Sequence, residues 1–248
     1  MTKIYDLDAS DIDCHGICKL SALLSRVQNL STAHANALGV GGDRMIAACG
    51  AVWMIVRQCL SLSRPIVYTD KLRITTWHRG PDKTPTVLRD FDIFVDDERV
   101  GEAVISWVLA DIESRRLVKP LSVQILADSP RPAKVKDIVP AKIKMPDGLT
   151  QVMSRTVNYS DTDINGHMNN TKYADIACDA IRYDRLKNRF ISEVQLNYLH
   201  ESFPGDEINV LCAQHEPARY VRGTDSQGQP RFDVSLSLSD YRERHLNP

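Results

Sequence analysis

Two similar six-residue turns lie 150 positions apart, and this repetition constrains the fold more than any other feature of the sequence. Residues 11–16 read Asp-Ile-Asp-Cys-His-Gly, and residues 161–166 read Asp-Thr-Asp-Ile-Asn-Gly. Each turn precedes an amphipathic helical pattern that is followed by several strand patterns. The shared order predicts a duplication. Two Asp and one Gly within six residues also arise by chance, so the turns alone leave coincidence open.

A proline-rich stretch separates the two halves of this 248-residue chain. Its prolines stand among Lys and Asp residues and disfavour a continuous helix or a central strand; they are Pro130, Pro132, Pro140 and Pro146. A chain of this length can fill two modest cores. We therefore expect an N-terminal domain at 1–126, a linker at 127–149 and a C-terminal domain at 150–248.

In the first half, apolar residues recur at steps of three and four from Leu20 to Leu38, and Gly39 follows. This spacing predicts a helix with one apolar face that ends near Gly39. Polar and apolar residues alternate at 87–95. The acidic residues at 96–98 predict a turn before the apolar run at 100–112.

The second half repeats this order. A helical stripe comprises Tyr173, Ile176, Ala177, Ala180 and Ile181, and strands are expected at 191–199, 206–213 and 232–238. The last of these alternates apolar residues with Asp and Ser, which is typical of an antiparallel sheet with one solvated face. We therefore expect an α+β fold in which each half packs one helix on an antiparallel sheet.

Charge and composition exclude several functional classes. Lys plus Arg number 31 and Asp plus Glu number 32, so no global field marks a nucleic-acid binder. No run of about 18 apolar residues predicts a membrane span. The segment 1–6 lacks a targeting pattern, so a cytoplasmic protein is expected.

The six cysteines are scattered and are expected to be reduced, structural thiols. Cys14 and Cys18 flank His15, which suggests zinc, but no second pair of ligands follows at finger-like spacing. We therefore predict neither a metal nor a cofactor.

The densest polar cluster lies at 159–170, just before the second helical stripe. If this segment is extended, Asp163, Asn165 and His167 project on one side and combine a carboxylate, an amide and an imidazole, groups suited to acyl hydrolysis. Asn169 or Asn170 is the expected helix N-cap. The plainer alternative is a tight turn ahead of a capped helix, with His167 on the surface.

Residues 160–173 closely resemble the signature Asp-x-Asn-x-His-(Val/Met)-Asn-Asn, followed by Tyr, of acyl-acyl carrier protein thioesterases. These are the plant FatA and FatB enzymes and their bacterial relatives, and the absence of a transit peptide here is similar to the bacterial type. The resemblance implies two tandem hot-dog domains with Asp163, Asn165 and His167 as catalytic residues. It also implies a catalytic acid after a Leu-x-Tyr strand, a position that Glu201 occupies. Plant members commonly carry Cys where this chain has Ser202.

The resemblance further implies hydrolysis of fatty acyl-acyl carrier protein thioesters, which terminates fatty acid biosynthesis. His15 and Ile17 stand where Asn165 and His167 are expected, so the N-terminal domain should be catalytically silent. Family resemblance gives that domain the acyl chain instead. Expected substrate-binding residues are Trp53, Met54 and Val56 in the first half and Asn169, Asn170 and Tyr173 in the signature.

Acylated acyl carrier protein is the expected partner, and a homodimer is possible. Because the carrier is acidic in this family, basic clusters at 115–119 and 182–189 are candidate docking surfaces, although such cations also serve solubility. Three alternatives stay open. They are a thioesterase for coenzyme A esters, a non-catalytic acyl-binding protein, and a hot-dog hydratase or dehydratase.

Overall fold

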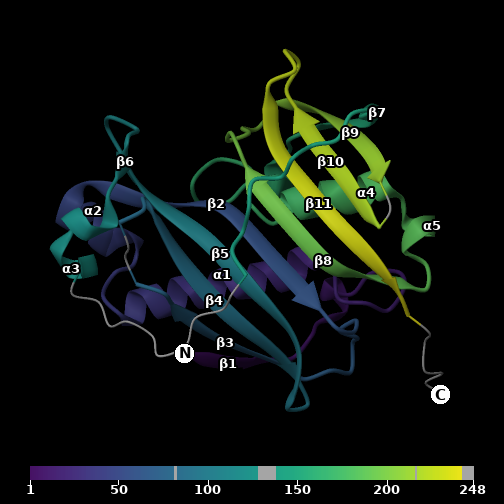
Figure 1. Ribbon diagram of the computed structural model, residues 1–248, viewed down its shortest axis with the longest axis horizontal. Helices are drawn as coiled ribbons and strands as arrows, with labels where there is room; N and C mark the ends of the chain where they lie inside the picture. Colours follow the sequence, from purple (N-terminus) through teal and green to yellow (C-terminus); the bar gives the residue numbers. More distant parts are fainter. Residues whose placement is uncertain (81–82, 128–137, 216, 242–248) are drawn as a thin grey trace.

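The computed structural model describes residues 1–80, 83–127, 138–215 and 217–241 (Figure 1). In this part of the chain, one antiparallel sheet runs in the order β1-β3-β4-β5-β2-β8-β11-β10-β9-β7, with β6 beside β5. The first half contributes β1 (Thr2–Tyr5), β2 (Ala51–Leu62), β3 (Leu72–His78), β4 (Thr86–Val95), β5 (Glu98–Asp111) and β6 (Leu117–Val118). The second half contributes β7 (Thr150–Thr156), β8 (Arg189–Tyr198), β9 (Glu207–His215), β10 (Ala218–Thr224) and β11 (Pro230–Asp240).

The sheet curves around two main helices, one from each half (Figure 1). They are α1 (Leu20–Ala37) and α4 (Lys172–Ile181); shorter helices are α2 (Gly42–Cys49), α3 (Gln124–Ala127) and α5 (Tyr183–Leu186). Single 3-10 turns are η1 (Ala9–Asp11), η2 (Pro120–Ser122) and η3 (Tyr159–Asp161). The α+β prediction is confirmed.

The first helical prediction is also confirmed. The face of α1 carrying Leu20, Leu23, Leu24, Val27 and Leu30 is buried, and Gly39 follows with a φ of 72°. Each fully buried aliphatic side chain stabilises the fold by about 1.5–3 kcal/mol. These residues share one core cluster with the buried face of α4, so apolar packing is continuous across the two halves.

Strand β2 pairs with β8 and joins the two halves at the centre of the sheet. Five antiparallel pairs run from Arg57 opposite Asn197 to Ser61 opposite Glu193. This seam closes the strand edges that each half would otherwise leave open, because β2 pairs with β5 on its other side and β8 with β11. The two halves therefore form one sheet.

The turn between β4 and β5 was predicted correctly, whereas several helices and strands were not. Asp96 and Asp97 adopt left-handed φ angles of 47° and 68° between β4 and β5, as the acidic cluster predicted. Among the elements that were not expected from the sequence are α2 and the strands β3 and β10. In β10 the residues Arg219 and Arg222 interrupt the apolar alternation, although Arg219 is buried.

The predicted linker at 127–149 lies partly outside the described residues, at 128–137. Residues 138–149 form neither helix nor strand. Asn197 of β8 holds this segment: its side-chain Oδ1 accepts the Ile143 N–H at 2.7 Å, and its Nδ2 donates to the Ala141 carbonyl at 3.0 Å. No helix in the described ranges has the length and apolarity needed to cross a membrane.

Candidate functional site

The signature residues form a tight turn between η3 and α4. The Asp163 N–H donates to the His167 carbonyl at 3.0 Å, and the Gly166 N–H donates to the Asp163 carbonyl at 3.0 Å. Gly166 has a φ of 78°, a left-handed conformation that glycine adopts without strain. The turn reverses the chain and brings residues 163 and 167 together.

The first-half turn has the same backbone. The Asp13 N–H donates to the Ile17 carbonyl at 2.8 Å, the Gly16 N–H donates to the Asp13 carbonyl at 3.1 Å, and the φ of Gly16 is 79°. In each turn an aspartate side chain accepts the backbone N–H two residues later. Asp13 accepts from His15 at 2.8 Å, and Asp163 accepts from Asn165 at 2.9 Å.

A neighbouring loop is duplicated as well. The Cys18 N–H donates to the Ile66 carbonyl at 2.7 Å, and the Met168 N–H donates to the Ser202 carbonyl at 2.8 Å. This pairing makes Pro65 the counterpart of Glu201. The first half therefore keeps the aspartate of the signature but not the other three predicted catalytic groups.

His167 and Asp163 face each other across the second turn. Their Nδ1 and Oδ1 atoms are 3.9 Å apart, and both side chains are largely buried. His167 Nδ1 also lies 3.3 Å from the Met168 carbonyl. A carbonyl only accepts hydrogen bonds, so this contact requires the proton on Nδ1 and leaves the Nε2 lone pair free.

Asn165 lies at the tip of the turn rather than on one side of an extended strand. It is exposed, and its neighbour Ile164 is fully exposed. The extended conformation considered from the sequence is therefore wrong. A reversed chain, not a period of two, brings Asp163 and His167 together, and Asn165 lies between them in the exposed part of the turn.

Glu201 lies in the loop after β8, directly before the residue that bonds to Met168. Its carboxylate forms an ion pair with Arg115 at 3.0 Å. In the described part of the chain no hydrogen bond links this carboxylate to His167. From the sequence, Arg115 was expected to belong to a docking cluster at 115–119. Its contact with Glu201 spans 86 positions, and no local pattern signals it.

Asn169 organises the start of α4. Its side-chain Oδ1 accepts the Thr171 N–H at 2.9 Å and the Thr171 hydroxyl at 2.8 Å, while its carbonyl accepts the Lys172 N–H at 2.9 Å. These bonds close a turn just ahead of the helix. The N-cap of α4 is Thr171, which makes no side-chain capping hydrogen bond, so the predicted N-cap at Asn169 or Asn170 is wrong. The internal bonds occupy the N–H groups of Thr171 and Lys172, so these two donors are not open to a ligand.

The remaining predicted substrate residues lie in two places. Tyr173 is buried, with its ring 4.9 Å from Phe232 and 5.7 Å from Tyr198 between centroids. Burial raises the pKa of Tyr173 above its ordinary value, so the hydroxyl stays protonated at neutral pH. Half-buried Asn170 directly follows Asn169.

Trp53, Met54 and Val56 are half-buried residues of β2. Trp53 donates its Nε1–H to the Val40 carbonyl at 2.9 Å and meets the Trp107 ring edge-on, with centroids 6.5 Å apart. Trp53 therefore anchors the loop before α2 to the sheet.

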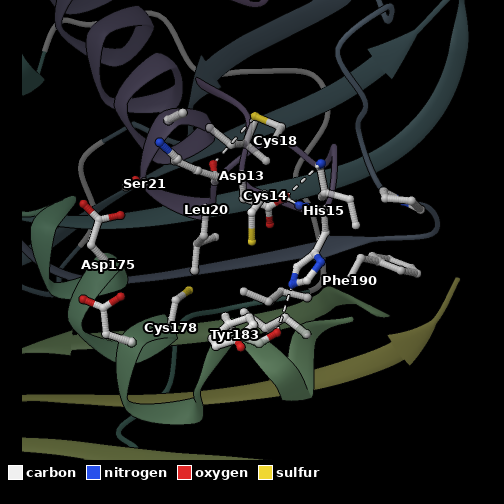
Figure 2. Close-up of a pocket in the computed structure, with 18 of the residues that line it drawn as sticks. Asp13, Cys14, His15, Cys18, Leu20, Ser21, Asp175, Cys178, Tyr183 and Phe190 are labelled. Atoms are coloured by element: carbon white, nitrogen blue, oxygen red, sulfur yellow. Dashed lines mark hydrogen bonds between the residues drawn. The ribbon is translucent and has the colours of Figure 1, made fainter. Parts of the chain in front are cut away.

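A cavity of about 820 Å³ lies at the first-half turn, away from the predicted catalytic residues. Figure 2 shows Asp13, Cys14 and His15 on one side and Cys178 and Tyr183 on the other. The His15 Nε2–H donates to the Tyr183 carbonyl at 2.9 Å. His15 thus ties the first-half turn to α5, a contact between residues 168 positions apart that no local sequence pattern predicts.

All six cysteines are free thiols. Among the described residues, no group of three or more His, Cys, Asp and Glu side chains is arranged to hold a metal ion.

Two family models match the chain. The model described as acyl-ACP thioesterase N-terminal domain matches residues 1–124, and the model described as acyl-ACP thioesterase C-terminal domain matches residues 147–242. Among curated proteins, a chloroplastic acyl-[acyl-carrier-protein] hydrolase of Cuphea viscosissima is 20% identical over 95% of this chain. A chloroplastic oleoyl-acyl carrier protein thioesterase of Coriandrum sativum is 22% identical over 78% of it. The alignments cover 58% and 57% of those proteins, so the chain spans less than two thirds of their length.

Solved structures identify the fold. An acyl-ACP thioesterase from Bacteroides thetaiotaomicron superposes with a TM-score of 0.84 at 21% identity, over 96% of this chain and 97% of that one. A 12:0-ACP thioesterase from Umbellularia californica superposes with a TM-score of 0.83 at 17% identity, over 97% of each chain. The predicted tandem hot-dog fold is confirmed.

Proposed function

The chain belongs to the acyl-acyl carrier protein (acyl-ACP) thioesterase family, and from this membership we propose that it hydrolyses fatty acyl-ACP thioesters to free fatty acid and carrier protein. The reaction would terminate fatty acid synthesis. The division into a silent domain at 1–126 and a catalytic domain at 150–248 is part of the proposal, as is a cytoplasmic location.

One observation carries the catalytic part: the reversed turn sets the Asp163 carboxylate 3.9 Å from the His167 imidazole. At that distance the pair is not a hydrogen bond, but a shift of about 1 Å would make it one. The carboxylate would then favour the tautomer with the proton on Nδ1. That tautomer is also the one that the Met168 carbonyl selects.

The proposed step is attack of water on the thioester carbon. His167 Nε2 accepts a proton from the water as the C–O bond forms, and the resulting imidazolium is stabilised by Asp163. The tetrahedral intermediate then expels the thiolate of the carrier's prosthetic group, which takes the proton from His167. Asn165, at the tip of the turn, is assigned to the developing oxyanion. A direct attack by the Asp163 carboxylate is the competing route.

Glu201 is assigned a second role at the same carbon, either water positioning or proton transfer. It forms an ion pair with the exposed side chain of Arg115 at 3.0 Å. Opening of that pair by an acidic carrier protein would free Glu201 for His167. Arg115 would then link docking to catalysis, and the cluster at 182–189 is the second candidate docking surface.

Steady-state hydrolysis of dodecanoyl-ACP tests the proposal. We expect His167→Ala and Asn165→Ala each to lower kcat by at least about 10²-fold, the usual effect of losing an acid–base or oxyanion group. Circular dichroism would verify folding. Activity near the wild-type level in both variants would refute the assignment.

The same assay with dodecanoyl-coenzyme A separates the rival thioesterase. A higher kcat/KM for dodecanoyl-coenzyme A than for dodecanoyl-ACP would make the coenzyme A ester the preferred substrate. Tight acyl binding without release of free acid would instead indicate the non-catalytic acyl-binding protein. Light scattering under the assay conditions would decide between monomer and homodimer.

A further inference from the structure

A buried arginine lies inside the N-terminal half without an acidic partner. Arg89 of β4 is only 5% exposed, and its described contact is the hydrogen bond from Nη1 to His34 Nδ1 of α1 at 2.7 Å. No carboxylate within 4 Å pairs with it among the described residues. A buried charge without a counter-ion destabilises a fold strongly, so this position calls for a compensating group.

The next residue shows how the chain pairs a buried charge elsewhere. Asp90 points to the other face of β4, because successive strand residues alternate. Its carboxylate accepts hydrogen bonds from Arg79 Nη2 at 2.7 Å and Nε at 3.0 Å. The buried Asp90 carboxylate is therefore neutralised by a bidentate ion pair with Arg79. The buried Arg89 guanidinium faces α1, and no anion of the described residues pairs with it.

The two imidazoles near Arg89 each use Nδ1 as a hydrogen-bond acceptor. His34 Nδ1 accepts from Arg89, and His78 Nδ1 accepts the Gly80 N–H at 3.0 Å. Both imidazoles therefore carry their proton on Nε2. Burial, with the charge of Arg89 as a further cause, lowers the pKa of His34 to about 4 and also lowers the pKa of His78, so both are neutral at pH 7.

A further donor lies on the same face of the sheet. His78, Arg89 and Ile105 are directly opposite one another across β3, β4 and β5, and Trp107 follows Ile105 by two residues. Among the described residues, the buried Trp107 Nε1–H has no hydrogen-bond partner. Arg89 and Trp107 therefore bring N–H donors to one face of the sheet, and the indole donor lacks an acceptor there.

We propose that Arg89, with Trp107, binds the carboxylate of an alkyl chain inside the N-terminal half. A carboxylate supplies four acceptor positions and one negative charge, which matches a guanidinium in a bidentate geometry. Two sources share this chemistry: a free fatty acid, and an acyl substrate whose far end carries a carboxylate. The inference rests on the proposed acyl-binding role of this half.

Calorimetric titration tests the binding directly. The probes are dodecanoate and dodecan-1-ol, which share chain length and differ in charge. We expect wild-type protein to bind dodecanoate at least about tenfold more tightly than the alcohol, and Arg89→Met to reduce that ratio below about twofold. Arg73→Met is the matched control, because Arg73 also lies in this sheet but pairs with Asp97 at the surface. It should keep the wild-type ratio.

Thermal unfolding separates a ligand-binding arginine from a structural one. Met fills similar volume without charge, so Arg89→Met should unfold at the wild-type temperature or above it in the absence of ligand, and dodecanoate should raise the melting temperature of wild-type protein only. A variant that melts several degrees lower without ligand, or an unchanged carboxylate-to-alcohol ratio, would overturn the proposal.

Turnover identifies the source of the carboxylate. Acyl thioesters of equal length ending in methyl or carboxylate are compared in wild type and Arg89→Met. A carboxylate preference that the substitution abolishes indicates the acyl terminus; binding of dodecanoate through Arg89 without that preference indicates the free fatty acid. Dodecanoate binding in a protein that hydrolyses no thioester would sustain this inference while removing the proposed function.

Discussion

The turns at 8–19 and 158–169 have one backbone and two sets of side chains. Each contains a 3-10 turn, the same turn hydrogen bonds and a glycine in the left-handed conformation. Yet His167 corresponds to Ile17, and Glu201 corresponds to Pro65. The two segments therefore share two aspartates and a glycine, whereas the positions of His167 and Glu201 differ between them.

The histidines of the two turns are used differently. His15 donates from Nε2 to the Tyr183 carbonyl, which fixes the first turn against α5. His167 contacts a carbonyl through Nδ1, which leaves Nε2 free. An imidazole in a turn is thus not evidence of catalysis by itself, because the nitrogen that remains unbonded decides what it can do.

Each turn is also held by an ion pair, and the two ion pairs differ in how deeply the aspartate is buried. Arg155 holds Asp161 in the second turn, and Arg26 holds Asp11 in the first. The Asp161 side chain is 2% exposed, whereas that of Asp11 is 15% exposed. The turn with the proposed catalytic groups is the more deeply anchored of the two.

The largest difference between the two turns should appear in kcat when Asp163 or Asp13 is replaced by asparagine. Asp163→Asn keeps the size of the side chain but removes the charge that stabilises the His167 imidazolium, so kcat should fall by at least about 10²-fold. Asp13→Asn should change kcat by less than about twofold, because Asp13 faces no imidazole of the reaction. Hydrolysis of dodecanoyl-ACP measures both. Equal losses in the two variants would break the comparison.

Removing the two anchoring arginines should give a smaller, graded effect on stability. Arg155→Met leaves the Asp161 carboxylate buried without its cation and should cost about 3 kcal/mol of unfolding free energy. Arg26→Met should cost about 1–2 kcal/mol, because Asp11 is better solvated. Urea unfolding at pH 7 measures both, and the reverse order would contradict the difference in anchoring.

Low pH should reduce the loss of unfolding free energy caused by Arg26→Met. Burial pushes the pKa of Asp11 up, but hydrogen bonds from Arg26 and from the Asp8 N–H outweigh it and hold the pKa below the ordinary 3.8. A depressed folded pKa stabilises the protein above about pH 4, and this contribution disappears as the pH falls through the folded value. The gap between wild type and Arg26→Met should therefore shrink between about pH 5 and pH 2.

The smallest effect should be identical in the two turns. A Cβ added at Gly16 or Gly166 would meet no atom within 4 Å, so the cost of alanine is the left-handed backbone alone. Each substitution should lower the unfolding free energy by about 1 kcal/mol. Thermal denaturation compares them. A difference beyond about 1 kcal/mol would show that one turn is held more rigidly than the other.

The parts predicted correctly from the sequence depend on neighbours in the chain. The stripe from Leu20 to Leu30, the turn at Asp96 and Asp97, and the duplicated turns all carry their signal within about 20 residues. The contacts that were missed join partners far apart in the chain. The Arg115–Glu201 ion pair and the β2–β8 seam join residues more than 85 and 130 positions apart, and no local periodicity encodes them.

The candidate site divides in the same way. Asp163 and His167 were found because both belong to the signature at 160–173, whereas the reversed turn that brings them together was not the conformation on which the prediction was based. The sequence pattern does not single out Arg89, because a single arginine in an alternating strand is typical of a surface residue. Only burial under α1, beside His34, distinguishes it.

The β2–β8 seam has a consequence for how such a protein can vary. In a symmetric dimer every substitution appears twice, so a residue must suit both copies of a site at once. Covalent union of two halves through one sheet removes that constraint. One copy of the ancestral turn can then preserve reactive side chains, while the other accumulates replacements and is retained for its contribution to packing.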